Sequence, residues 1–182
     1  MEEKENANTG ACDFRNVEPL MLKLPYPAIQ VREENIKYAN LLSMDYCGSV
    51  SELSAITQYI NNENRLSSQN CPIAKTILGI AIAEMIHLQK IGQMIVLLGG
   101  SIDFVAKHRD GKQEMWSPDC LTIPEKVNEM IAADIESEKA AISQYRMHMR
   151  MIHDHNVNAV LARIIKDEEY HIKLLLDLRK EL

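Results

Sequence analysis

The sequence contains Glu84-Met85-Ile86-His87 and, later, Glu168-Glu169-Tyr170-His171, two copies of a glutamate followed by a histidine three positions on. Residues three apart on an α-helix lie on the same face, so each pair can act together. Both pairs interrupt stripes of apolar residues whose three-and-four spacing is typical of a buried helical face. An uncompensated buried carboxylate costs roughly several kcal/mol. One copy would be weak evidence, but two copies indicate metal ions that compensate the charges.

Two lone glutamates extend this pattern into an internal repeat. Each begins the same series of residue types at the same spacing, namely Glu52, Ala55, Ile56, Gln58 and Tyr59, and Glu138, Ala141, Ile142, Gln144 and Tyr145. The chain is therefore interpreted as two equivalent helix pairs, which together contribute four carboxylates and two imidazoles. Carboxylates bridge metal ions well and imidazole can cap each ion. We predict a buried site for two divalent cations.

Length and composition favour one helical domain. The 182 residues are enough for one well-packed domain. Apolar residues make up 46% of the chain and aromatic residues only 5%, with 7 glycines and 6 prolines, which favours helices over a sandwich or barrel. The net charge of −6, without a basic cluster, argues against nucleic-acid binding. No uninterrupted apolar run approaches the roughly 18 residues of a membrane span.

The cysteines and the start of the chain bear on location. Cys12, Cys47, Cys71 and Cys120 are scattered, and none forms the C-x-x-C pair of a zinc ribbon or a rubredoxin-type iron site. Scattered single cysteines are typical of a reducing compartment, and we expect Cys47 and Cys71 to be small buried residues. The acidic segment Met1–Glu5 lacks the apolar core of a signal peptide. We therefore predict a cytoplasmic protein.

The chain divides into an arm and a helical body. Residues 1–30 carry no helical period and contain several prolines, which predicts an extended N-terminal arm. Residues 31–182 form the predicted body. Within it, apolar spacing predicts four long helices, over about 35–62, 70–98, 122–153 and 156–182.

The predicted helix ends and the middle connection define the topology. Asn70 and Asn156 are predicted caps of the second and fourth helices, and Thr122-Ile123-Pro124-Glu125 has the form of a capping box for the third. The connection over residues 101–121 has no clear period. A connection of about 20 residues is unusual in a compact domain, except in a bundle with one long crossover. We predict an all-α four-helix bundle with a long crossover between helices 2 and 3.

These motifs as a set resemble the ferritin-like di-metal carboxylate superfamily, which includes rubrerythrin, bacterioferritin and manganese catalase. The resemblance extends from about residue 35 to residue 182 and implies a ferritin-like bundle that binds two transition-metal ions per chain, iron or manganese. The metal ligands it implies are Glu52, Glu84, His87, Glu138, Glu168 and His171. It further implies hydrogen peroxide or dioxygen as the substrate, an external electron donor for some members, and a homo-oligomer of two or more chains.

Two stretches resemble manganese catalase and its short spore-coat relatives, namely Tyr26-Pro27 followed by residues 35–52, and Ile80–Ile95. In manganese catalases the carboxylate of the last pair lies outside the metal ligands. This leaves two roles for Glu168, a bridging ligand or a base beside the metals. Rubrerythrin has a second glutamate one turn after the third-helix ligand, and Ala141 at that position indicates that its carboxylate switch is missing here.

Three further residues are candidates for supporting the site. Tyr59 and Tyr145 each follow a predicted ligand glutamate by two helical turns. Their hydroxyls could donate to ligand carboxylates across the site, or bond elsewhere in the core, and we favour the first reading. Asp167 precedes Glu168. In di-iron relatives such an aspartate faces the histidine of the other half, here His87, whereas a solvated surface aspartate is the alternative.

The end of the third predicted helix is rich in soft ligands, namely Met147, His148, Met149, Met151, His153 and His155. A role in metal entry is conceivable. We favour the simpler reading that a helix C-terminus attracts cationic and polar residues through its dipole.

Three functions remain open. The first is a di-iron or di-manganese oxidoreductase acting on hydrogen peroxide or dioxygen, as a peroxidase or a catalase. A rubrerythrin-like peroxidase would need an external electron donor because the sequence shows no rubredoxin motif, whereas a catalase needs none. The second is a ferroxidase or iron-binding protein, and the third a coat component with a vestigial site. Iron and manganese both accept carboxylate and imidazole ligands, so the donor types do not choose between them.

Overall fold

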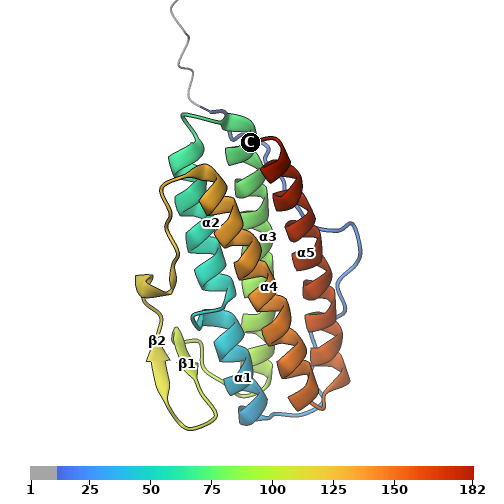
Figure 1. Cartoon of the computed structure of the whole chain (residues 1–182). Helices are drawn as coiled ribbons and strands as arrows, with labels where there is room; N and C mark the ends of the chain where they lie inside the picture. The colour runs from blue at the N-terminus through green and yellow to red at the C-terminus, as the bar shows by residue number, and fades with distance from the viewer. Residues whose placement is uncertain (1–11) are drawn as a thin grey trace, which may run out of the picture.

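A bundle of long helices forms most of residues 12–182, the part of the chain that the computed structural model describes. The elements in chain order are α1 (Ile36–Cys47), α2 (Glu52–Leu66), α3 (Cys71–Leu97), β1 (Val105–Lys107), β2 (Gln113–Met115), the 3₁₀-helix η1 (Pro118–Cys120), α4 (Val127–Met151) and α5 (His155–Lys180). Figure 1 shows α2, α3, α4 and α5 side by side, with α1 prolonging the line of α2. The fold is the ferritin-like four-helix bundle that the sequence predicts.

The first bundle helix is broken, so the prediction of one continuous helix from residue 35 to 62 is wrong. Gly48 is extended, with φ −75° and ψ −172°, and ends α1. The hydroxyl of Ser51 then caps α2 by accepting a hydrogen bond from the Ser54 amide at 3.2 Å. The break puts Glu52 in the first turn of α2, where the helix dipole favours a carboxylate. At its other end α2 continues to Leu66, beyond the predicted end.

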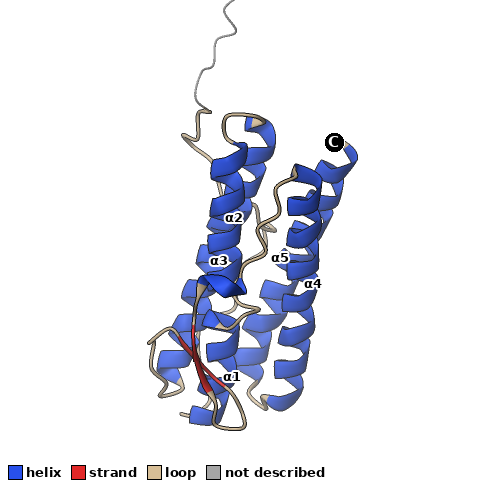
Figure 2. Ribbon diagram, turned by 60° about the vertical axis from the view of Figure 1, so that its left-hand side comes forward, coloured by secondary structure: helices blue, strands red, loops and turns tan. Residues whose placement is uncertain are grey.

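The crossover between α3 and α4 is long, as predicted, but more structured than the sequence suggests. It contains the antiparallel hairpin β1–β2, with Val105 opposite Met115, and the short helix η1. Figure 2 shows the hairpin, in red, beside α1 at the lower end of the bundle. The Lys107 amide fixes it there by donating to the Ser43 hydroxyl at 2.9 Å.

Two of the predicted helix caps are wrong. The Thr122 amide donates to the Gln58 side chain at 2.9 Å, and Arg65 donates to the Pro124 carbonyl at 2.6 Å. These contacts hold the segment against α2, so α4 begins only at Val127. Helix α5 is capped by the carboxylate of Asp154 rather than by Asn156.

The N-terminal segment is bonded to the bundle along its length. Residues 17–30 contain no helix or strand, and in Figure 1 the blue chain passes behind α3 and α5 before it reaches α1. Leu20 donates its amide to the Gly79 carbonyl on α3 at 2.9 Å. Arg163 of α5 donates to the carbonyls of Leu22 and Leu24 at 2.7 and 3.1 Å. The segment therefore belongs to the packed structure.

The expectation that Cys71 is a small buried residue like Cys47 is wrong, because Cys12 and Cys71 form a disulfide with their Cα atoms 5.4 Å apart. The pair ties the N-terminal segment to the start of α3. Cys71 is therefore not a buried free thiol, whereas Cys47 is buried and free, as expected. Because disulfides are typical of oxidising compartments, the cysteines do not support the cytoplasmic location, which stays a prediction.

Helix α3 is long and apolar enough to cross a membrane, but it is the core helix of this bundle. One apolar cluster includes Ile91 of α3 and Val160 of α5. A second includes Ile77 of α3 and Ile131 of α4. The two Glu–x–x–His pairs fall between these clusters along α3 and α5, so their polar groups form a layer between two apolar clusters.

Candidate metal centre

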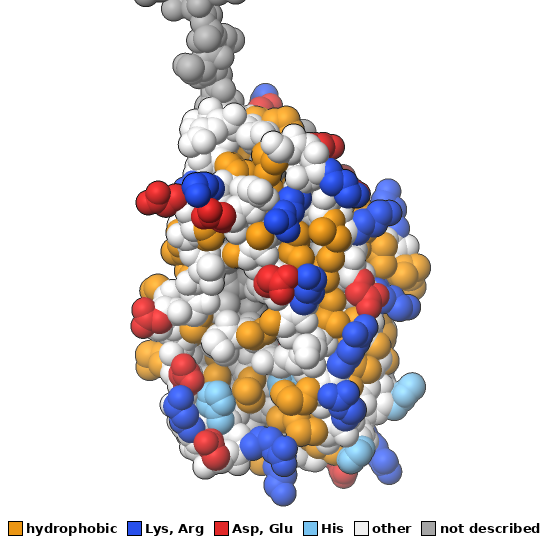
Figure 3. Space-filling view, in the orientation of Figure 1, with side chains coloured by type: hydrophobic (Ala, Val, Ile, Leu, Met, Phe, Trp, Pro, Cys, Tyr) orange, Lys and Arg blue, Asp and Glu red, His pale blue; other side chains and the backbone are white. Residues whose placement is uncertain are grey.

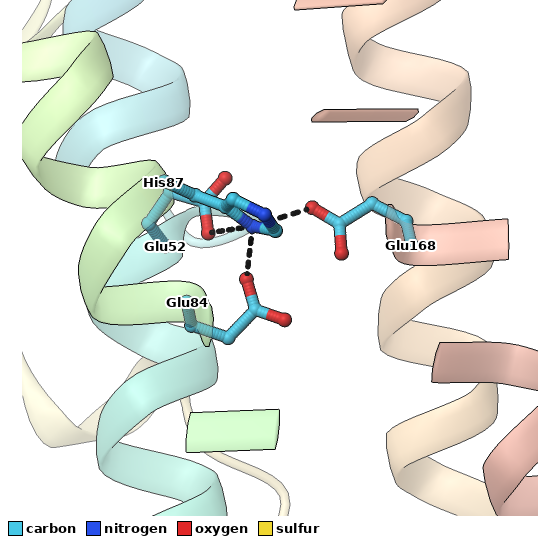
Figure 4. Close-up of side chains that lie close together, drawn as sticks. All are labelled: Glu52, Glu84, His87 and Glu168. Atoms are coloured by element: carbon cyan, nitrogen blue, oxygen red, sulfur yellow. Dashed lines mark hydrogen bonds and ion pairs between the residues drawn. The ribbon is translucent and has the colours of Figure 1, made fainter. Parts of the chain in front are cut away.

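Two carboxylates span the two imidazoles at the centre of the bundle. The oxygens of Glu84 lie 2.9 Å from His87 Nδ1 and 2.8 Å from His171 Nδ1. The oxygens of Glu168 lie 3.3 and 3.0 Å from the same two nitrogens. Figure 4 shows Glu168 reaching from α5 towards the His87 ring, which Glu52 and Glu84 approach from the other side. Glu84 and Glu168 thus occupy equivalent, shared positions.

The lone glutamates complete two overlapping groups. Glu52 Oε2 lies 3.7 Å from His87 Nδ1, and Glu138 Oε1 lies 3.6 Å from His171 Nδ1. Four potential ligand atoms in each group lie within 4.8 Å of one another, and the groups are Glu52, Glu84, His87 and Glu168, and Glu84, Glu138, Glu168 and His171. All six residues are buried. The structure brings together the six residues that sequence reasoning proposes as ligands.

Several ligand atoms at the centre of the site lack hydrogen-bond partners and are placed as they would be around a cation. Glu84 Oε1, both carboxylate oxygens of Glu168 and His171 Nδ1 are buried and make no hydrogen bond to any described residue. They are nevertheless close, as the distance of 2.8 Å between Glu84 Oε1 and His171 Nδ1 shows. Buried polar atoms normally have hydrogen-bond partners. Close lone pairs that are not aligned with a donor are the arrangement that a shared metal ion satisfies, so the donor set can hold metal.

The pKa values show how this cluster balances its charge without metal. Burial raises the pKa of Glu52 and Glu138 well above the usual range, and neighbouring carboxylates raise it further. Burial also opposes ionisation of Glu84, but the adjacent imidazoles lower its pKa well below the usual value. Conversely, nearby carboxylates outweigh burial and raise the pKa of His87. Any proton that these imidazoles and carboxyls hold would be released when metal binds.

The outward nitrogens of both histidines have hydrogen-bond acceptors. His87 Nε2 lies 3.3 Å from Asp167 Oδ2, and His171 Nε2 lies 2.8 Å from the Leu20 carbonyl oxygen. A proton held on Nε2 leaves Nδ1 free to face the centre. Asp167 is fully buried rather than solvated. Burial raises its pKa, but hydrogen bonds from His87 and Arg163 lower it to about 2.

Each tyrosine of the repeat crosses to the other half. Tyr59 donates to Glu138, and Tyr145 donates to Glu52. Both tyrosines are buried. Burial, followed by the adjacent carboxylates, raises the pKa of both hydroxyls well above the usual value. They therefore stay protonated and donate, which holds one oxygen of each lone glutamate.

Sequence reasoning missed a further pair of buried polar groups. On one side, Gln144 and His148 both bond Asp45 at 2.8 Å. On the other, Gln58 and Asn62 bond Asp134 at 3.2 and 3.0 Å. The repeat carried a signal, because Gln58 and Gln144 are matched residues in it.

The cluster of methionines and histidines seen in the sequence does not come together as one buried group. His148 is buried against Asp45, while His153 and His155 are exposed. Sequence reasoning also missed Leu20 and Arg163. Leu20 acts through its backbone carbonyl. Every residue has such a group, so the residue type gives no signal in the sequence.

A ferritin-like bundle with buried carboxylates and imidazoles at its centre defines the class of this protein. The family model described as rubrerythrin matches residues 48–179, and the chain belongs to this family. It is 24% identical over 160 residues to a probable manganese catalase from Clostridium acetobutylicum, covering 79% of this chain and 70% of that protein.

Solved structures share the fold. The manganese catalase KatB from Anabaena PCC7120 superposes with a TM-score of 0.77 at 22% identity, covering 88% of this chain and 78% of that one. Rhodobacter capsulatus bacterioferritin has a TM-score of 0.66 at 24% identity, over 81% of this chain and 86% of that one. Mycobacterium tuberculosis bacterioferritin BfrA has a TM-score of 0.67 at 24% identity, over 82% of this chain and 90% of that one.

Proposed function

We propose that this protein is a di-metal oxidoreductase that consumes hydrogen peroxide. The observation that carries the proposal is the pair of carboxylates, Glu84 and Glu168, each lying within 3.3 Å of both inward-facing imidazole nitrogens. The similarity to a probable manganese catalase supports peroxide as the substrate, and membership of the rubrerythrin family supports a redox role.

The donor set suits two manganese or iron ions. Glu84 and Glu168 would bridge the ions, Glu52 and His87 would complete one site, and Glu138 and His171 the other. Four carboxylates and two neutral imidazoles would balance two dications without residual charge, which matters in a dry interior. Oxygen-rich sites with imidazole accept both metals. Bound there, a pair of redox-active ions would supply and accept the electrons of peroxide reduction and oxidation.

The equal placement of Glu84 and Glu168 supports bridging as the role of Glu168, rather than that of a separate base. Tyr59 and Tyr145 would hold one oxygen of each lone glutamate and leave the other for metal. The apolar clusters on both sides would exclude bulk water.

A small recess would let the substrate approach. A cavity of about 310 Å³ lies between the crossover and α4, and the hollow is visible in Figure 3. Its lining includes Val50 and Ser54, which flank Glu52 in the chain, and Ser137, which precedes Glu138. A molecule the size of hydrogen peroxide fits this space.

Metal analysis combined with peroxide assays tests the proposal. Protein loaded with Mn²⁺ or Fe²⁺ should hold two ions per chain and consume hydrogen peroxide. A catalase would convert two H₂O₂ into two H₂O and one O₂ without a reductant, and a peroxidase would need two electrons per H₂O₂. Glu168→Gln should abolish turnover, whereas Glu169→Gln, a change in an exposed neighbour, should not. Full loading without peroxide loss, but with Fe²⁺ oxidation by dioxygen, would instead establish the ferroxidase alternative.

A further inference from the structure

We propose that the N-terminal segment over residues 18–26, here called the strap, is a positioning element of the metal centre that orients both imidazoles. The inference rests on the proposed di-metal function and deepens it. The strap lies outside the helices that carry the six proposed ligands. It supports the outward nitrogen of each histidine in a different way, directly for His171 and through Asp167 for His87.

His171 is held by the strap directly. Its Nε2 donates to the Leu20 carbonyl oxygen at 2.8 Å. That carbonyl is fixed because the amide of the same residue donates to the Gly79 carbonyl of α3 at 2.9 Å. A peptide carbonyl can only accept, so the contact requires the proton on Nε2 and turns Nδ1 towards the centre.

His87 is held by the strap through one intermediate carboxylate. Asp167, the acceptor for His87 Nε2, receives the Leu22 amide at 2.8 Å and the Tyr26 hydroxyl at 2.9 Å. Arg163 lies 2.7 Å from the same carboxylate and 4.5 Å from the centroid of the Tyr26 ring. Two strap groups thus fix the residue that orients His87.

Arg163 and the disulfide hold the strap itself. Arg163 is only 5% exposed and donates to the carbonyls of Leu22 and Leu24. The buried guanidinium therefore donates hydrogen bonds to strap carbonyls and forms an ion pair with Asp167. The Cys12–Cys71 disulfide joins the chain just before the strap to the first residue of α3. Removing the strap would leave His171 Nε2 without its acceptor, and would leave Asp167, the acceptor of His87 Nε2, without two of its donors.

Gly79 offers a test that changes neither a proposed ligand nor the strap. A methyl group on Gly79 would lie 2.6 Å from Leu20 Cγ and 3.1 Å from the Glu18 carbonyl oxygen, so Gly79→Ala requires the Leu20 side chain to shift and crowds the strap backbone at Glu18. The matched control is Gly92→Ala on the same helix. Its added methyl would lie 3.2 Å from the Tyr46 ring and has no strap atom among its nearest neighbours.

Two readouts are needed, one with metal and one without. In ¹⁵N-labelled metal-free protein, proton–nitrogen correlation of the imidazoles reports whether each Nε2–H is protected from exchange. Mn²⁺ titration followed by electron paramagnetic resonance of the free ion reports affinity. Gly79→Ala should lose protection at His171 and weaken Mn²⁺ binding roughly 10- to 100-fold, the usual range for residues that support metal ligands. Gly92→Ala should change neither.

Tyr26→Phe provides a second, milder variant in case Gly79→Ala does not fold. It removes the hydroxyl that donates to Asp167 and keeps the ring beside Arg163. We expect faster exchange at His87 Nε2–H, weaker Mn²⁺ binding, and an unchanged His171 signal. If folded Gly79→Ala, or Tyr26→Phe in its place, keeps the wild-type imidazole signals and Mn²⁺ affinity, the strap is only a cover. If wild-type protein binds no metal pair but the imidazole signals respond as expected, the di-metal function fails and the positioning role stands.

Discussion

The two halves of the bundle present the same donors to the centre but support them differently. In the half formed by α2 and α3, His87 is backed by the ionised carboxylate of Asp167. In the half formed by α4 and α5, His171 is backed by a neutral peptide carbonyl. An anionic acceptor raises the basicity of an imidazole more than a neutral one does. The comparison teaches that a repeat in sequence need not give two equivalent metal sites.

Removing a shared carboxylate should break both halves together. Glu84→Gln takes away a group that approaches both imidazoles, and a neutral amide cannot bridge two cations in the same way. We expect fewer than one tightly bound ion per chain and loss of peroxide consumption, measured by elemental analysis and oxygen evolution. Glu129→Gln, an exposed change in the first turn of α4, is the control. Retention of two ions by Glu84→Gln would refute a shared site.

Neutralising Asp167 should affect one half only. Asp167→Asn keeps the shape of the side chain but removes the negative charge behind His87. We expect roughly 10- to 100-fold weaker binding of one Mn²⁺ ion and little change for the other, measured by stepwise titration. The control is Asp177→Asn, an exposed change on the same helix. Equal weakening of both steps would contradict the proposed difference between the halves.

The buried aspartates that flank the centre should make stability depend on pH. Burial raises the pKa of Asp134 to about 7, although Gln58 and Asn62 donate to it. The folded state therefore holds a proton that the unfolded state releases near pH 4. The stabilisation is complete below that pH and is lost as the pH rises towards 7, by about 1.4 kcal/mol per unit. Asp134→Asn should remove this slope, measured by urea unfolding of both proteins in the same metal state.

The crossed tyrosines should each affect the affinity for one ion, by a similar factor in the two halves. Tyr59→Phe and Tyr145→Phe each remove one hydrogen bond to a lone glutamate. A hydrogen bond to a charged group contributes about 1.5–3 kcal/mol, so we expect a roughly tenfold or larger fall in the affinity for one ion. The measurement is Mn²⁺ titration of each variant. Tyr170→Phe is the control, because Tyr170 lies on α5 and does not belong to either group of proposed ligands. If only one of the two variants had a large effect, the expectation of similar effects would be wrong. The two halves would then differ at the lone glutamates as well as at the histidines.

Much of this protein follows from local sequence patterns. Apolar stripes at helical spacing predict the bundle, and Glu84, His87, Glu168 and His171 are conspicuous because each is polar within such a stripe. The long crossover follows from the missing period over residues 101–121. These features could be predicted because each depends on residues close together in the chain, where helical geometry alone decides which side chains share a face.

Other features depended on contacts that no local pattern encodes. The late start of α4 and the Cys12–Cys71 pair arise from residues that meet only in the packed structure. The difference between the two halves likewise depends on Leu20, whose contribution is a backbone carbonyl that every residue possesses. The sequence by itself determined which donors face the core. Only the tertiary structure decided what stands behind each imidazole, because the position of a peptide group across the bundle is set by packing and not by residue type.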